Sequence, residues 1–176
     1  MKRTITLFLL LVCVCAHAQD YCFSVKDGHI IWQEVYETDL DSAAVMSILQ
    51  SKGELTGITN TPLGVSCALV PHVVDYVGAG FTTMQASSMV IGSELEGHVV
   101  LQFREGRYRV TVDNLVFRRS MAFIGNGGEV PVRFEEFFLD RKGNIRRQVS
   151  TNHVDECVDY DLNKIFEIRE AEDEKW

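Results

Sequence analysis

The sequence predicts an α+β domain in which helices pack on one face of an antiparallel sheet. One β-hairpin is clearly marked, and further strand-like segments follow one another with no helix between them. Helical periodicity is confined to two segments that are set apart from these strands. The predicted order is therefore strand, helix, four strands, an irregular insert and a C-terminal helix.

Residues 1–18 have the three parts of a secretory signal peptide. Two basic residues form the positive end, and residues 5–14 are an apolar stretch too short to span a membrane permanently. Residues 16–18, Ala-His-Ala, supply the small side chains that a signal peptidase needs. We therefore expect cleavage between Ala18 and Gln19, leaving a single domain over residues 19–176.

The same segment predicts where the chain goes. Cys13 and Cys15 lie near the depth of a lipid-modified cysteine, but each follows a valine where such a site has glycine, alanine or serine. We therefore expect a periplasmic or secreted protein without a lipid anchor.

Cleavage also changes the charge and the cysteine count. The mature chain carries 15 basic and 25 acidic residues, a formal net charge of −10, which disfavours nucleic acid and anionic lipid as partners. No other apolar run approaches 18 residues, so no transmembrane span is expected. Three cysteines remain, and any one pairing among Cys22, Cys67 and Cys157 is open, although Cys67 and Cys157 have the surroundings of buried thiols.

The first half of the mature chain alternates between strand-like and helical patterns. β-Branched and aromatic residues mark strands, apolar residues at helical spacing mark a helix, and Gly, Pro and Asp-Gly mark turns. Asp39 or Asp41 can cap the helix. The predicted segments are a lead-in over 20–28, a strand over 29–38, a helix over 42–52, a loop over 53–64, and strands over 65–77 and 81–91, with a helix as the alternative for the last.

The marked hairpin joins residues 97–104 and 107–117 through a two-residue turn, Glu-Gly, at 105–106. Closing the chain there gathers apolar side chains on one face and polar side chains on the other. The alternation then slips, and a bulge at residues 113–114 would return the following apolar residues to the apolar face. The predicted pairs are Phe103 with Tyr108, Leu101 with Val110 and Val99 with Val112, and the polar face collects Gln102, Arg104, Arg107, Arg109 and Thr111.

The last third of the chain combines an irregular insert over 119–150 with a helix over 152–170. Within the insert, residues 134–139 and 144–149 form a second hairpin, or the first of them starts a helix. Asn152 is the expected cap of the C-terminal helix, whose acidic first turn suits the helix dipole. Its apolar stripe comprises Val154, Cys157, Val158, Leu162, Ile165 and Phe166.

The residue pattern over roughly 27–118 is similar to that of a known family. It consists of DGHIIWQEVY from residue 27, a helix, and EGHVVLQFREGRYRVTV from residue 96, in which Gly-Arg-Tyr-Arg at 106–109 is the most recognisable piece. This pattern resembles a domain of unknown function with a TBP-like fold that occurs in exported proteins of Bacteroidota. The resemblance implies export and a curved antiparallel sheet with helices on one side, and it supplies no catalytic residues.

Residues with catalytic or metal-binding chemistry are present but match no recognised motif. His72 and Asp75 lie three residues apart with Ser66 nearby, yet a strand turns His72 and Asp75 to opposite faces and no nucleophile elbow is present. No zinc or calcium motif organises the other histidines and carboxylates. We therefore expect no catalytic residues, no metal and no cofactor.

Two groups of side chains are candidate binding residues instead. An aromatic set either lines a sheet–helix cavity for an apolar ligand or simply forms the core. A basic cluster could contact an anionic envelope component or the acidic patch of a partner. The aromatic set is Trp32, Tyr36, Phe81, Phe103, Tyr108 and Phe117, and the basic cluster is Arg141, Lys142, Arg146 and Arg147.

The leading functional prediction is an exported, non-enzymatic protein of the cell envelope that binds another protein or a ligand. The first alternative is a binder of a small apolar ligand in a sheet–helix cavity, and the second is a hydrolase of an envelope polymer. The partner would be an unknown envelope protein or a small ligand, because nucleic acid conflicts with the charge.

Overall fold

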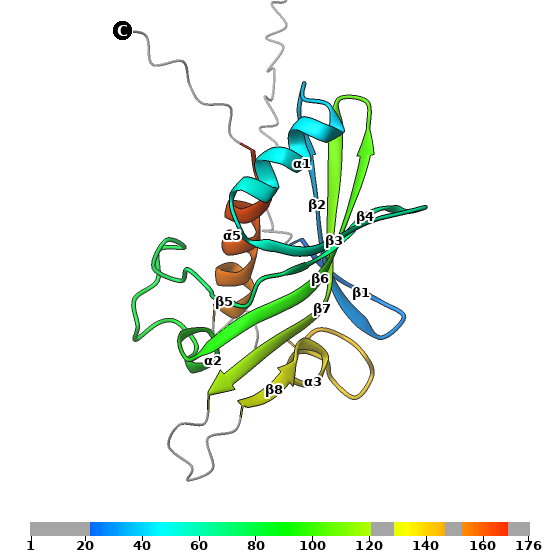
Figure 1. Cartoon of the computed structure of the whole chain (residues 1–176). Coiled ribbons are helices and arrows are strands. Elements are labelled where there is room, and N and C mark those ends of the chain that lie inside the picture. The colour runs from blue at the N-terminus through cyan, green and yellow to red at the C-terminus, as the bar shows by residue number, and fades with distance from the viewer. Residues whose placement is uncertain (1–21, 121–128, 147–152, 169–176) are drawn as a thin grey trace, which may run out of the picture.

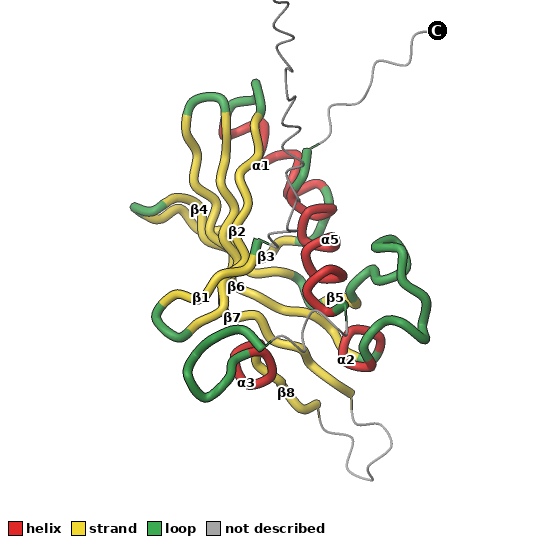
Figure 2. The backbone as a smooth tube through the Cα atoms, turned by 180° about the vertical axis from the view of Figure 1, so that it is seen from behind, coloured by secondary structure: helices red, strands yellow, loops and turns green. Residues whose placement is uncertain are grey.

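The computed structural model describes residues 22–120, 129–146 and 153–168. Its strands form one antiparallel, eight-stranded sheet, and helices α1 (Ser42–Ser51) and α5 (Val154–Phe166) cover one face of it (Figures 1 and 2). The predicted α+β class and the position of the helices on one face are therefore confirmed. The predicted signal peptide with Ala18 and Gln19 lies outside the described residues. No helix in these ranges is long and apolar enough to cross a membrane.

The centre of the sheet is the hairpin of β6 (Ser93–Arg104) and β7 (Arg107–Ser120). All three apolar pairs predicted from the sequence are observed in its register. The register shifts by one residue where Asn114, with φ of 50°, adds to β7, so the predicted bulge is also confirmed. Because of this bulge, Leu115 and Phe117 point into the core and are fully buried.

The central hairpin is longer than its neighbours, so each of its strands pairs with two different partners. The tip half lies in the order β1-β2-β7-β6-β4-β3, whereas beyond the bulge β5 pairs with β6 and β8 pairs with β7. The change of partners gives the curved, branched sheet seen in Figure 1. The flanking strands are β1 (Phe23–Lys26), β2 (His29–Glu37), β3 (Leu55–Thr61), β4 (Gly64–Leu69), β5 (His72–Val73) and β8 (Glu129–Arg133).

The predicted count of strands was too low. The lead-in over 20–28 contains β1, which pairs with β2 across Asp27 and Gly28, both with the positive φ of a tight hairpin turn. The loop predicted over 53–64 contains β3, an edge strand whose side chains after Leu55 are all exposed, so it has no apolar alternation to detect. The strand predicted over 65–77 is divided into β4 and β5.

Two other segments are helical where strands were considered. Residues 81–91 form turns and the short helix α2 (Ser88–Ile91), so the strand prediction was wrong there and the helical alternative was right. The predicted insert is also more regular than expected, since it contains β8 and the helix α3 (Phe134–Phe138). Of the second hairpin, predicted over 134–139 and 144–149, the residues described up to 146 show an isolated bridge between Leu139 and Ile145.

The two long helices match their predictions closely. Asp41 caps α1 by accepting a hydrogen bond from the Ala44 amide at 2.8 Å. Helix α5 is shorter than predicted, and its N-cap is His153, with φ of 54°, so the prediction of Asn152 as the cap was wrong. Every residue of its predicted apolar stripe is buried.

Aromatic side chains connect the sheet to α5 through their polar ends. Trp32 Nε1 donates to Asp159 Oδ1 at 2.8 Å, the Tyr36 hydroxyl donates to Asn163 Oδ1 at 2.8 Å, and the Tyr108 hydroxyl donates to the Phe166 carbonyl at 2.6 Å. Because each ring packs in or against the core while its polar atom has a partner, burial leaves none of these three groups unsatisfied.

Helix α5 is also held by two charged side chains. Lys52, just after α1, donates from Nζ to the carbonyls of Ile165 and Glu167 at 2.8 and 2.9 Å, which satisfies carbonyls that a helix end leaves open. On β5, His72 Nε2 lies 2.7 Å from Asp161 Oδ2 in a largely buried ion pair. Through these contacts, both the end of α1 and strand β5 are hydrogen-bonded to α5.

Candidate functional site

The sheet face opposite the helices, which we call the open face, carries the chemistry that the core does not use. Residues alternate along each strand, so side chains next to buried core residues point to this side. None of its members is fully buried. Its central members are Gln33, Val35 and Glu37 on β2, Arg107, Arg109, Thr111 and Asp113 on β7, His98, Val100, Gln102 and Arg104 on β6, and Gly64 and Ser66 on β4.

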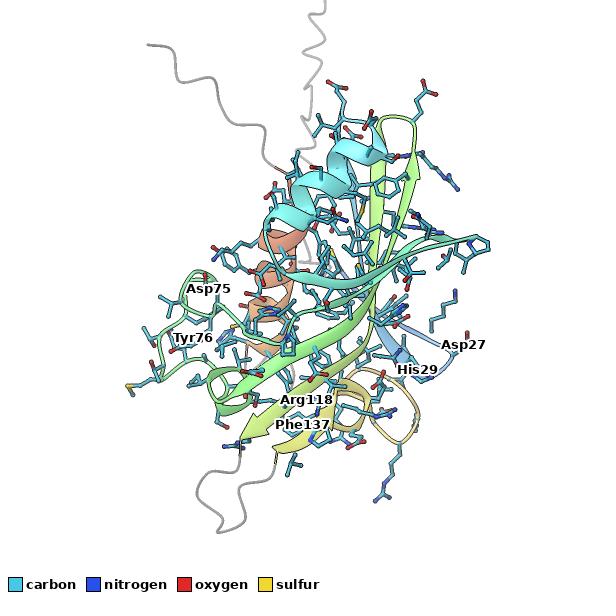
Figure 3. The ribbon with its side chains drawn as sticks, viewed as in Figure 1. Asp27, His29, Asp75, Tyr76, Arg118 and Phe137 are labelled. Carbon is cyan, nitrogen blue, oxygen red and sulfur yellow. The ribbon has the colours of Figure 1, made fainter. Side chains whose placement is uncertain are left out.

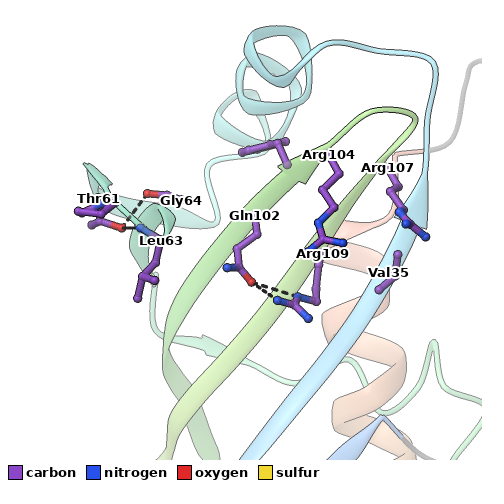
Figure 4. A pocket seen from close by; sticks show the side chains of 10 residues that line it. Val35, Thr61, Leu63, Gly64, Gln102, Arg104, Arg107 and Arg109 are labelled. Carbon is purple, nitrogen blue, oxygen red and sulfur yellow. Dashed lines mark hydrogen bonds between the residues drawn. The ribbon is translucent and has the colours of Figure 1, made fainter.

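A groove of about 550 Å³ lies on the open face near the tip of the central hairpin (Figure 4). The β3–β4 hairpin forms one wall, where Thr61 Oγ1 donates to the Gly64 carbonyl at 2.8 Å and shapes the turn. Gly64, with φ of 134°, sits where a side chain would overlap the Leu101 carbonyl oxygen, so the hairpin can lie against β6 only with glycine here. This basic groove is lined by Val35, Thr61, Pro62, Leu63, Gly64, Gln102, Phe103, Arg104, Arg107 and Arg109.

Three arginines give the basic groove its charge. Arg104 and Arg107 are directly opposite each other in the register of β6 and β7. Like charges in such a pair destabilise a sheet, and neither guanidinium forms an ion pair among the described residues. Arg109 is held in place because its Nε donates to Gln102 Oε1 at 3.0 Å. Glu37, opposite Arg107, is the nearest acidic position in the register.

Apolar side chains complete the basic groove. Leu63, at the tip of the β3–β4 hairpin, is 72% exposed, and Val35 on β2 is 45% exposed. The core of a protein interface is more apolar than its rim and is enriched in arginine. The groove can therefore hold a segment that combines carboxylates with apolar side chains.

Three hydrogen-bonded polar side chains lie across the open face, farther from the tip of the central hairpin than the basic groove. Ser66 Oγ on β4 lies 2.8 Å from His98 Nε2 on β6, and His98 Nδ1 lies 3.0 Å from Asp113 Oδ1 on β7. In the neutral imidazole, Nδ1 donates to the carboxylate, which can only accept, and Nε2 is left to accept the hydrogen bond from the Ser66 hydroxyl. The side chains of His98 and Asp113 are 42% and 33% exposed, so solvent and solutes reach them.

These partners differ from those that sequence spacing suggested. His72 contacts neither Asp75 nor Ser66 and instead pairs with Asp161, which also accepts the Asp75 amide at 2.9 Å. Asp75 lies in the loop beyond β5, away from the open face (Figure 3), where the pKa of its carboxyl is lowered by the hydrogen bond from Lys164. The pairing of His98 with Asp113 could have been read from the hairpin register, because these residues lie next to the predicted pair Val99 and Val112.

The aromatic set predicted from the sequence is distributed through the core and its edge. Trp32, Tyr108 and Phe117 are at most 1% exposed, and Phe103 lines the basic groove. Tyr36 stacks on Tyr108 with ring centroids 5.1 Å apart, and Phe81 stacks on His153 at 4.4 Å. A ligand-binding role for this set stays a prediction.

The basic cluster predicted from the sequence lies apart from the basic groove. Arg141, Lys142 and Arg146 are exposed in the turn that follows α3, where Arg146 Nε donates to the Leu139 carbonyl at 2.7 Å. Arg147 lies outside the described residues. A binding role for this basic cluster also stays a prediction. The arginines of the central hairpin form a second basic surface.

Three cysteines lie among the residues that the structure describes. Cys22, Cys67 and Cys157 are free thiols, and the last two are buried as predicted. Burial raises the pKa of both Cys67 and Cys157 to about 11, so both stay protonated near neutral pH. Among the residues that the structure describes, no group of three or more His, Cys, Asp or Glu side chains is placed to hold a metal ion.

Comparisons with known proteins add little to this description. No family model and no curated protein sequence matches the chain. A similar solved structure is that of a TBP-like protein from Parabacteroides distasonis, with 9% sequence identity, a TM-score of 0.49, and coverage of 82% of this chain and 92% of that chain. No conclusion about function follows from this likeness.

Proposed function

We propose that this chain is an exported binding protein of the cell envelope and that its basic groove holds an acidic segment of a partner protein. The observation that carries this proposal is that Arg104 and Arg107 lie opposite each other on the open face, with no ion pair among the described residues, in a protein with a net charge of −8. Two like charges held opposite each other oppose folding, and a partner's carboxylate would turn that repulsion into attraction.

The shape and lining of the groove favour a protein segment over other anions. It is open to solvent, and the exposed Leu63 and Val35 suit apolar side chains between carboxylates. A long polyanion such as duplex DNA would extend past the three arginines of a protein whose net charge is −8. A short acidic, partly apolar peptide fits both the charge and the size.

A fluorescence anisotropy titration tests this proposal. The probe is a labelled peptide of alternating Glu and Leu, and a Lys-Leu peptide and a DNA duplex serve as comparison probes. We expect binding of the Glu-Leu peptide only, weakened by salt, and weakened by about tenfold in Arg107→Gln or Arg109→Gln. Equal binding of the three probes would overturn the proposal.

The matched control comes from the basic cluster after α3. The single variant Arg141→Gln removes the same charge as Arg107→Gln, but from an exposed turn that the groove does not include. We expect it to bind the Glu-Leu peptide as the wild type does. Loss of binding here, with Arg107→Gln unaffected, would transfer the function to the cluster predicted from the sequence.

Export is the second part of the proposal and is supported only by the signal peptide predicted over residues 1–18. The intact mass of protein isolated from its own cell envelope tests it. We expect a chain that begins at Gln19 and carries no lipid. A mass that includes diacylglycerol on Cys13 or Cys15 would show a lipoprotein instead.

A hydrolase is the second candidate function, and one observation favours it. The Ser66–His98–Asp113 chain has the hydrogen-bond order of a nucleophile, a base and an orienting carboxylate.

A further inference from the structure

The open face carries a candidate nucleophile, Ser66, in addition to the basic groove. A serine hydroxyl becomes nucleophilic when a neutral imidazole accepts its proton and a carboxylate holds that imidazole in the correct tautomer. Ser66, His98 and Asp113 come from three adjacent strands and meet these geometric conditions at 2.8 and 3.0 Å. We propose that Ser66 is a reactive serine that is transiently acylated by an ester whose acyl group carries a negative charge.

The sheet itself fixes this arrangement. His98 and Asp113 are directly opposite each other in the central hairpin, at the edge of the bulge. Ser66 on β4 lies diagonally from His98, because its own partner in the register is Val100. Three side chains on paired strands need no loop rearrangement to stay aligned, so the geometry is preorganised.

The position of the basic groove selects the substrate class. Ser66 and Gly64 lie on the same face of β4, two residues apart, which is about 7 Å along the strand. An acyl group whose carboxylate lies at Arg109 can therefore present its ester carbonyl near Ser66. This choice of an anionic substrate rests on the proposed binding groove, whereas the reactivity of Ser66 does not.

The reaction balances with water as the only co-reactant. The Ser66 Oγ forms a bond to the carbonyl carbon while His98 Nε2 takes the hydroxyl proton, and the departing alcohol leaves with that proton. Water then attacks the acyl carbon while His98 Nε2 takes a proton from it. The bond between the acyl carbon and Ser66 Oγ breaks, His98 returns that proton to Oγ, and the acyl group leaves as a carboxylic acid. Asp113 acts as a positioning residue, since its carboxylate accepts hydrogen bonds only from His98 and Asn114 among the described residues.

Stoichiometric labelling tests the nucleophile without requiring fast turnover. The purified protein is treated with a neutral fluorophosphonate, so that an Oγ–P bond forms as the P–F bond breaks and fluoride leaves. Peptide mass spectrometry then locates the label. We expect the label of the wild-type protein on Ser66. A label that is absent, or that is spread over several exposed serines, would overturn the proposal.

Variants separate the roles of the three residues. We expect Ser66→Ala to abolish labelling, His98→Gln to slow it by about 100-fold, and Asp113→Asn to slow it with partial rescue in Asp113→Glu. Thr111→Val is the matched control, because Thr111 is a hydroxyl on the same face whose partner is Gln33 and not a histidine. Equal labelling rates in Ser66→Ala and the wild type would leave only a structural hydrogen-bond chain.

A pair of chromogenic esters tests the substrate class. We expect 4-nitrophenyl succinate to be hydrolysed faster than 4-nitrophenyl acetate, and Arg109→Gln to remove this preference while labelling of Ser66 persists. Labelling without any preference would refute the anionic substrate but keep the nucleophile. Conversely, Ser66→Ala should bind the Glu-Leu peptide normally, so failure of binding and failure of reactivity are distinguishable.

Discussion

The two faces of the sheet differ in what the polar atoms of their side chains contact. On the helix-covered face, aromatic rings are buried and their polar atoms donate to α5, as Trp32, Tyr36 and Tyr108 show. On the open face, side chains pair across strands and remain partly exposed, and Arg104 faces Arg107 without an ion pair. The first face has the features of a surface that stabilises the fold, and the second has those of a surface kept for binding.

The largest expected effect separates the faces directly. Trp32→Ala removes a fully buried ring and its hydrogen bond to Asp159, so we expect the free energy of unfolding to fall by about 4 kcal/mol in urea denaturation. Val35→Ala on the same strand, but on the open face, should change it by less than about 0.5 kcal/mol. Similar losses for both variants would contradict the division between faces.

Asp161 provides the second largest effect. It is the one charged residue among those described that is classed as buried, and Asp161→Asn leaves His72 without its counter-charge. We expect a loss of about 3 kcal/mol, measured by the same urea denaturation. The double variant His72→Gln/Asp161→Asn should recover part of this loss, and a loss that is simply additive would show that the two side chains are not coupled.

A smaller effect is expected at the end of α5. Lys52→Met keeps the length of the side chain but removes the donor to the Ile165 and Glu167 carbonyls. We expect a loss of about 1 kcal/mol, together with faster amide hydrogen exchange in the last turn of α5. Unchanged exchange there would mean that water replaces the ammonium group without cost.

The pH dependence of stability should give the smallest of these effects. Burial alone lowers the pKa of His72, but the hydrogen bonds to Asp161 and the Val70 carbonyl outweigh it and hold the pKa above its ordinary 6.5. The contribution is therefore fully present below pH 6.5 and is lost as the pH rises through the raised value. Urea denaturation across this range should show the decline in the wild type and a flatter profile in His72→Gln.

The sequence could predict the parts of the fold that depend on local patterns. The register of β6 and β7, the bulge after Val112, the stripe of α5 and the Asp41 cap follow from alternation, helical spacing and capping chemistry. Strand β3 could not be found in this way, because an exposed edge strand has no buried face and so no period.

The candidate site was predictable only in part. The polar face that contains Gln102, Arg104, Arg107 and Arg109 follows from the hairpin alone. The contact of Ser66 with His98 depends on β4 pairing with β6 across 32 residues, which no local pattern determines. For the same reason His72 was compared with its sequence neighbour Asp75, whereas its partner Asp161 lies on α5, 89 residues away.

We propose that the repulsion between Arg104 and Arg107 on the open face lowers the free energy of unfolding and keeps a basic surface for binding. The most direct measurement is the free energy of unfolding of Arg104→Gln together with its affinity for the Glu-Leu peptide. We predict that stability rises by a few tenths, about 0.3 kcal/mol, as the repulsion from Arg107 is removed, while the affinity falls. A variant that loses stability, or that binds the peptide as tightly as the wild type, would contradict the account.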